Sequence, residues 1–122
     1  MDELIQRIVA AVGVEPAVAE KAIGIIFDFL MKDGPSDKVQ GLVDAIPGAA
    51  AALEKARADA GGGGMFNLGG VMGAGSRLMG LGLGMGDVQG VTREVMGFAR
   101  EKAGEDKVAE IVAAVPGLSQ FV

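Results

Sequence analysis

The stretch Asp37–Gly48, which reads DKVQGLVDAIPG, returns later in the chain as Asp106–Gly117, which reads DKVAEIVAAVPG. Seven of the twelve positions are identical, and two more exchange one branched aliphatic residue for another. The offset is 69 residues, and the same offset places Val12-Gly13-Val14 on Leu81-Gly82-Leu83 without a gap. Self-similarity at a fixed offset is typical of duplicated structural units. We therefore predict that the chain consists of two diverged copies of one unit.

The first copy has the pattern of a helical unit, because its apolar residues recur three and four positions apart. We expect helices at residues 4–12, 16–32, 37–46 and 49–59, with Pro16 in the first turn of the second helix and Ser36 or Asp37 capping the third. The second of these helices is apolar around more than half of its circumference. It is therefore predicted to lie at the centre of its unit.

The second copy repeats this plan from about residue 66 onward. Asp87 is expected to cap a long helix that Gly104 closes, and a further apolar stripe runs over residues 108–115. No segment alternates with a period of two, so no sheet is predicted. The expected fold is an all-α helical bundle in which two pseudo-repeated units of three to four helices share one core. The units are residues 1–60 and 66–122 of a single domain, joined by a glycine-rich linker at 61–65.

Composition excludes several classes of function. The chain has 122 residues, half of them apolar, and contains no His, Cys, Trp or Tyr. The commonest general base, thiol nucleophiles and the usual zinc ligands are therefore missing. The net charge of −5 argues against nucleic acid, which is bound through a basic surface.

Thirteen of the 21 glycines lie between Gly61 and Gly90. A phosphate-binding loop is not supported there, because Ser76 stands where such a loop requires lysine. A membrane-spanning helix is disfavoured by Arg77 in the middle of the apolar segment and by the lack of Trp and Tyr anchors. The favoured interpretation is that residues 65–82 form a helix weakened by glycine, packed where a neighbouring backbone leaves no room for side chains.

No catalytic constellation emerges from the remaining polar residues. The chain's serines have no His to accept a proton, and Ser36 beside Lys38 is explained by helix capping. Glu101 and Glu105 are four residues apart, but Gly104 lies between them and the lysines beside them indicate a solvated surface. We therefore predict no enzyme activity, and no catalytic, cofactor-binding or metal-binding residue.

These elements also resemble a known family. The order of Val12-Gly13-Val14, a long helix, Ala45-Ile46-Pro47-Gly48, a glycine-rich middle, Leu81-Gly82-Leu83 and a last long helix is similar to the bacterial VcgC/VcgE-type domain of unknown function. The resemblance covers residues 8–103. It implies a helical fold and a bacterial source, and it implies no activity or site residues. The second Val-Pro-Gly element of this chain departs from the family plan.

Two functions are compatible with these observations. The first is a non-enzymatic interaction or structural protein, with a second copy (a homodimer) or another protein as its partner, bound through the glycine-rich helix or an exposed Met and Leu face. The alternative is a module that binds an apolar small molecule or a lipid between its helices. No cofactor, nucleic acid or membrane partner is expected. The chain begins without the features of a secretory signal, which predicts a cytoplasmic location.

Overall fold

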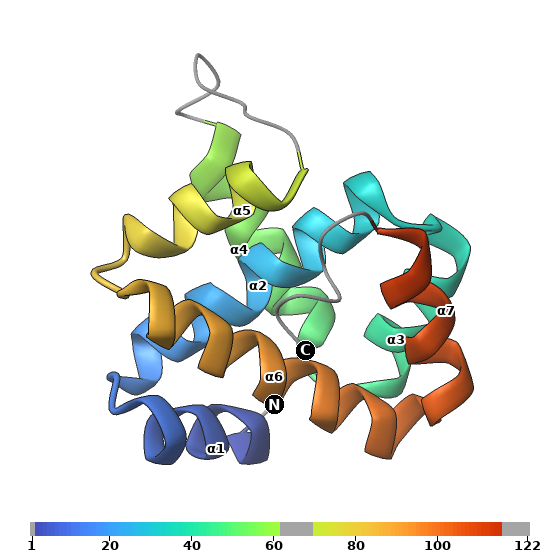
Figure 1. The fold of residues 1–122 in the computed structure, drawn as a ribbon, viewed down its shortest axis with the longest axis horizontal. Coiled ribbons are helices and arrows are strands. Elements are labelled where there is room, and N and C mark those ends of the chain that lie inside the picture. The colour runs from blue at the N-terminus through green and yellow to red at the C-terminus, as the bar shows by residue number, and fades with distance from the viewer. Residues whose placement is uncertain (1, 62–69, 116–122) are drawn as a thin grey trace.

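The computed structural model describes residues 2–61 and 70–115, and within these ranges the chain forms seven α-helices and no strand (Figure 1). The helices are α1 (Asp2–Val12), α2 (Pro16–Asp33), α3 (Ser36–Ala45), α4 (Ala49–Gly61), α5 (Gly70–Met79), α6 (Met85–Ala103) and α7 (Glu105–Ala114). The predicted all-helical class is confirmed. Gly61 ends α4, and the rest of the predicted linker lies outside the described residues.

The helix ends agree with the expected breaks, but two of the expected caps differ. Gly13 follows α1 with a φ of 81°, a conformation that glycine adopts without strain. The expectation that Ser36 or Asp37 caps α3 is wrong: Pro35 occupies the cap position, and no side chain caps the helix there. Ser36 is already helical, and the carbonyl of Pro35 accepts the first hydrogen bonds of the helix from the amides of Lys38 and Val39. Asp87 lies inside α6, and its Oδ2 accepts a hydrogen bond from the amide of Gly84 at 3.2 Å.

Helix α2 lies at the centre of the molecule, as predicted (Figure 1). All nine residues from 22 to 30 are buried, although an amphipathic surface helix would bury only one stripe. This is possible because α1, α3, α4, α5 and α6 all pack against α2. The apolar sequence of α2 therefore reflects cover on every side.

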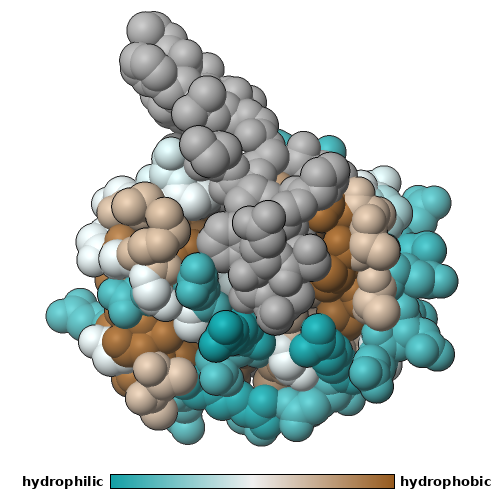
Figure 2. Space-filling model, viewed as in Figure 1, coloured by the Kyte–Doolittle hydropathy of each residue, from teal (hydrophilic) through white to brown (hydrophobic). Residues whose placement is uncertain are grey.

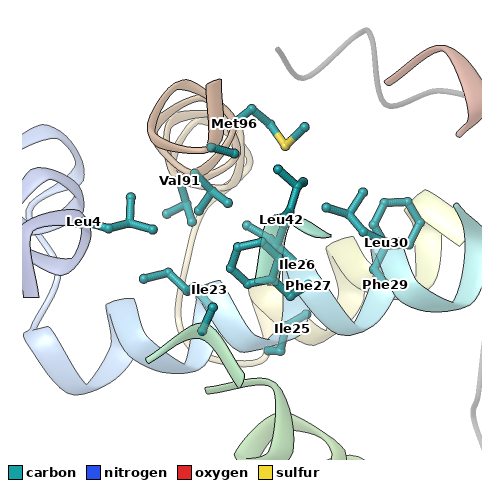
Figure 3. Packing of buried hydrophobic residues seen from close by; sticks show 14 of the residues in the cluster. Leu4, Ile23, Ile25, Ile26, Phe27, Phe29, Leu30, Leu42, Val91 and Met96 are labelled. Atoms are coloured by element: carbon teal, nitrogen blue, oxygen red, sulfur yellow. The ribbon is translucent and has the colours of Figure 1, made fainter. Parts of the chain in front are cut away.

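The buried apolar residues form one contiguous cluster that draws on all seven helices or the turns beside them. Figure 3 shows Leu4 of α1, Ile23 of α2 and Val91 of α6 pointing into the same space between their helices. All three side chains are fully buried. Among the described residues, the cluster contains two aromatic residues of α2 and one of α6, so aliphatic side chains make up most of the packing there.

Helices α1 and α5 each pack mainly against a long helix that is distant in sequence. Helix α1 contacts α6 more extensively than it contacts α2, and α5 contacts α2 more extensively than it contacts α6. The helix bounds also recur at the offset of the sequence repeat: α2 begins at Pro16 and α6 at Met85, while α3 spans Ser36–Ala45 and α7 spans Glu105–Ala114. Gly82, which corresponds to Gly13 at this offset, likewise has a positive φ, of 94°.

Helices α2 and α4 approach each other closely at Gly24. A Cβ atom on Gly24 would stand 2.2 Å from the carbonyl oxygen of Ala52. The face of α4 that meets α2 is made of small residues, with Ala49, Ala52 and Ala56 all buried. Small residues let two helix backbones approach closely, so Gly24 is required by packing.

The glycine-rich segment was expected to supply this kind of contact, and at Gly75 that expectation is wrong. A Cβ atom on Gly75 would meet nothing within 4 Å. The side chains of residues 71–74 lie outside the description, so the comparison rests on Gly75. The neighbouring backbone that excludes side chains lies instead against α2.

Substitution Gly24→Ala is expected to lower the free energy of unfolding by about 1–3 kcal/mol, because α2 and α4 must separate to admit the methyl group. The matched control is Gly41→Ala in α3, where a Cβ atom would meet nothing within 4 Å. That control should raise stability by about 0.5–1 kcal/mol, through the better helix propensity of alanine. Urea denaturation of both variants measures the difference, and equal effects would contradict the packing argument.

Candidate functional site

The most unusual polar feature is Asp28, which lies in the middle of the buried part of α2. Its side chain has no solvent exposure, and it is the one charged residue between Ala22 and Met31. A buried carboxylate without partners is strongly unfavourable, so the surrounding helices must supply compensating groups.

Three cationic side chains provide that compensation. Nη1 of Arg77, from α5, donates to Oδ2 of Asp28 at 2.8 Å. Nζ of Lys32, one turn further along α2, lies 3.3 Å from the same oxygen. Nε of Arg57, from α4, lies 3.5 Å from Oδ1. Arg77 also donates from Nη2 to the backbone carbonyl of Ala56 in α4 at 3.1 Å. We refer to Asp28, Lys32, Arg57 and Arg77 as the Asp28 cluster.

The electrostatics of the Asp28 cluster keep the carboxylate ionised. Burial by itself raises the pKa of Asp28, because the charged form loses its hydration. The hydrogen bond from Arg77 and the charge and hydrogen bond of Lys32 act in the opposite direction and outweigh burial. The pKa of Asp28 therefore lies below its ordinary value of 3.8.

This arrangement is suited to holding helices together and unsuited to proton transfer. A general acid or base works best when its pKa lies near the operating pH, whereas the pKa of Asp28 is shifted away from neutrality. The carboxylate is also occupied by three donors from α2, α4 and α5. The Asp28 cluster thus ties the glycine-rich helix α5 to the central helix α2 and to α4.

The residues weighed as catalytic candidates in the sequence do not converge on the Asp28 cluster. Ser36 and Ser76 are exposed, and Ser119 lies outside the described residues. Thr92 is buried and donates from Oγ1 to the carbonyl of Val88 at 2.9 Å, which accounts for its hydroxyl group. Glu101 forms a bidentate ion pair with Arg7 on the surface between α6 and α1.

Asp28 and Arg77 were not paired by sequence reasoning, although a signal was present. Each is the single charge in an otherwise apolar segment, Asp28 within residues 22–31 and Arg77 within residues 65–86. Two lone charges of opposite sign in apolar segments predict a buried ion pair, because neither is stable there alone.

A second feature is the exposed apolar surface where α5 turns into α6. Met79 is 47% exposed and Met85 is 59% exposed, and these are the strongly exposed large apolar side chains among residues 2–58 and 75–115. Gly75 and Met79 are one turn apart and share a face of α5. In Figure 2, teal surface gathers at the side of α3 and α7, and paler surface lies toward the side where α5 meets α6.

Two further properties follow from the same described part of the chain. It contains no group of three or more acidic side chains placed to hold a metal ion. Among its helices, none is both long and apolar enough to cross a membrane.

Comparison of the chain with protein-family models, with curated proteins and with solved structures gave no significant match. The resemblance to the VcgC/VcgE-type domain therefore stays a prediction.

The substitution Asp28→Asn tests the electrostatics of the Asp28 cluster. Because the folded-state pKa lies below the unfolded value of 3.8, the ionised carboxylate stabilises the fold above that pH. The contribution is lost as the pH falls through the folded-state pKa. The variant should lose about 2 kcal/mol of stability at neutral pH and show a shallower decline in acid.

Thermal unfolding followed from neutral pH down to about pH 2 measures this difference in slope. Glu101→Gln, which removes the exposed partner of Arg7, is the control and should shift the neutral-pH midpoint less. Parallel pH curves for the wild-type chain and Asp28→Asn would contradict an ionised, stabilising Asp28.

Proposed function

We propose that this protein is a non-enzymatic interaction protein, and that its contact surface is the outward face of α5 together with the turn into α6. The observation that carries the proposal is the exposure of Met79 and Met85, because the other described large apolar side chains are buried or partly buried. Contiguous exposed apolar surface marks contact sites in soluble proteins, and Met79 and Met85 flank the same turn between α5 and α6. We call this the Met79–Met85 surface; it comprises Gly75, Met79, Gly80, Gly82 and Met85.

The glycines of the Met79–Met85 surface support the proposal. Gly75 is helical and has no neighbour that a Cβ atom would meet, so packing within the chain does not require glycine there. A glycine inside a helix is less favourable than alanine by about 1 kcal/mol. A face that carries glycine beside an exposed methionine allows another backbone to approach closely, and methionine adapts its shape to a partner.

We propose a second copy of the chain as the partner. An exposed apolar surface can pair with itself across a two-fold axis, which is the commonest way in which soluble proteins assemble. The non-enzymatic part of the proposal is supported by the Asp28 cluster, in which the buried carboxylate of the described helices is held ionised by three cations. The predicted binding of an apolar ligand and the predicted cytoplasmic location stay predictions.

We also propose that the chain is a duplication of one helical unit, with residues 1–60 and 66–122 as its copies within one domain. The matching bounds of α3 and α7 and the positive φ of Gly13 and Gly82 support this. The packing of α1 on α6 corresponds to the packing of α5 on α2, because α1 matches α5 and α2 matches α6 at the same offset. Under this proposal, each copy places its first helix against the long helix of the other copy.

The double substitution Met79→Gln with Met85→Gln tests the contact surface. Because glutamine has a similar length and a polar end, we expect the dissociation constant of the dimer to rise by about tenfold or more. Sedimentation velocity over a concentration series measures it. Ala10→Gln is the matched control, because Ala10 is exposed on α1 and corresponds to Met79 at the 69-residue offset. A wild-type chain that stays monomeric at high micromolar concentration would overturn self-association.

Gly75→Ala separates stability from association. The added methyl group meets nothing within the chain, so the free energy of unfolding should rise by about 0.5–1 kcal/mol. The same methyl group stands on the proposed contact face, so dimer affinity should fall. Gly97→Ala in α6, which is also unopposed, should raise stability and leave affinity unchanged. Equal affinities for the two variants would remove α5 from the contact surface.

A further inference from the structure

Helix α5 is intrinsically the weakest of the helices that cover α2. Three of its ten residues are glycine, at positions 70, 73 and 75, and glycine inside a helix favours the unfolded chain. Within residues 75–79, whose side chains are described, Leu78 is the one that is buried. Helix α1, which occupies the comparable place on α6, has no glycine and buries both Leu4 and Ile8.

The polar anchor of α5 is Arg77. Its guanidinium group bonds to the carboxylate of Asp28 in α2 and to the carbonyl of Ala56 in α4, so a single side chain fastens α5 to both neighbours. The side chain of Arg77 is 29% exposed and can therefore be hydrated with little movement. Among residues 75–79, Arg77 is thus the polar anchor of α5 and Leu78 its buried apolar anchor.

The rest of the Asp28 cluster makes this anchor releasable. Breaking a buried ion pair is normally very unfavourable, because it leaves an uncompensated charge. Asp28 keeps two other cations when Arg77 leaves, with Lys32 at 3.3 Å and Arg57 at 3.5 Å, and neither belongs to α5. Undocking of α5 therefore does not leave the carboxylate unpaired.

We propose that α5 is a releasable cover for α2 that Arg77 holds in place. Helix α5 undocks as a unit while the remaining helices stay folded. Local opening of this kind is favoured where few buried contacts hold an element. Undocking uncovers the flank of α2 around Asp28 and displaces the outward face of α5. The proposal does not require the contact surface proposed above, because it concerns the isolated chain.

Hydrogen–deuterium exchange with mass spectrometry, at a concentration where the chain is monomeric, tests the proposal. In the wild-type chain, amides of α5 should exchange at least about tenfold faster than amides of α1 and of residues 22–30. Low concentrations of urea should raise the α5 rate less than the rate of residues 22–30, because undocking exposes less surface than global unfolding does.

Arg77→Gln should raise the α5 exchange rate by a further tenfold or so and leave α6 unchanged. Arg7→Gln is the matched control, since it removes an arginine that joins α1 to α6 and should not alter α5. Asp28→Asn provides a second route if Arg77→Gln folds poorly, and it should accelerate exchange in α5 more than in α1, which has no residue in the Asp28 cluster. Exchange of α5 at the same rate and with the same urea dependence as α2 would overturn the proposal, because α5 would then open only with global unfolding.

Discussion

The enclosure of α2 is the constraint on which the rest of this structure depends. A helix with nine consecutive buried residues must be covered on all sides, and five other helices pack against it. That requirement explains why most of the other helices are arranged around α2. It also explains the close approach at Gly24, because α4 covers its flank of α2 at a distance that leaves no room for a Cβ atom.

Because α2 is enclosed, Asp28 influences how the surrounding helices are placed. In a surface helix an aspartate would be hydrated, whereas here its environment is made by neighbouring helices. Arg77 and Arg57 must reach it from α5 and α4, and Lys32 reaches it from the next turn of α2. A single carboxylate thereby determines where three helices lie relative to one another. Ion pairs on the surface, such as Lys38 with Glu110 between α3 and α7, are hydrated and carry much less of this specificity.

Much of the helical plan could be predicted from the sequence, because helix boundaries are encoded locally. Gly13, Pro16 and Gly104 stop or start helices through their own backbone preferences, and the predicted bounds lie within a few residues of those observed. The central position of α2 also followed from its apolar circumference. The cap of α3 was predicted wrongly, because the helix begins one residue after Pro35 without a side-chain cap, and Ser36 already belongs to it.

The Asp28 cluster and the cross-packing of α1 and α5 could not be derived in the same way. Asp28 and Arg77 are 49 residues apart, and periodicity carries no information on which distant helices meet. The close packing that glycine permits was predicted for the wrong segment, for a related reason. Glycine abundance pointed to residues 65–82, but the close contact depends on which residue faces a neighbour, and that residue is Gly24.

The packing of α1 against α6 also has a consequence for the order in which the chain acquires its structure during synthesis. Arg7 and Glu101 meet across 94 positions of sequence, so α1 emerges from the ribosome long before its main partner exists. Until α6 has been made, the apolar side of α1, with Leu4 and Ile8, has only α2 to cover it. Contacts between such distant positions form late and slowly. The nascent chain therefore carries α1 incompletely buried until α6 has been synthesised, and the core between these two helices closes only then.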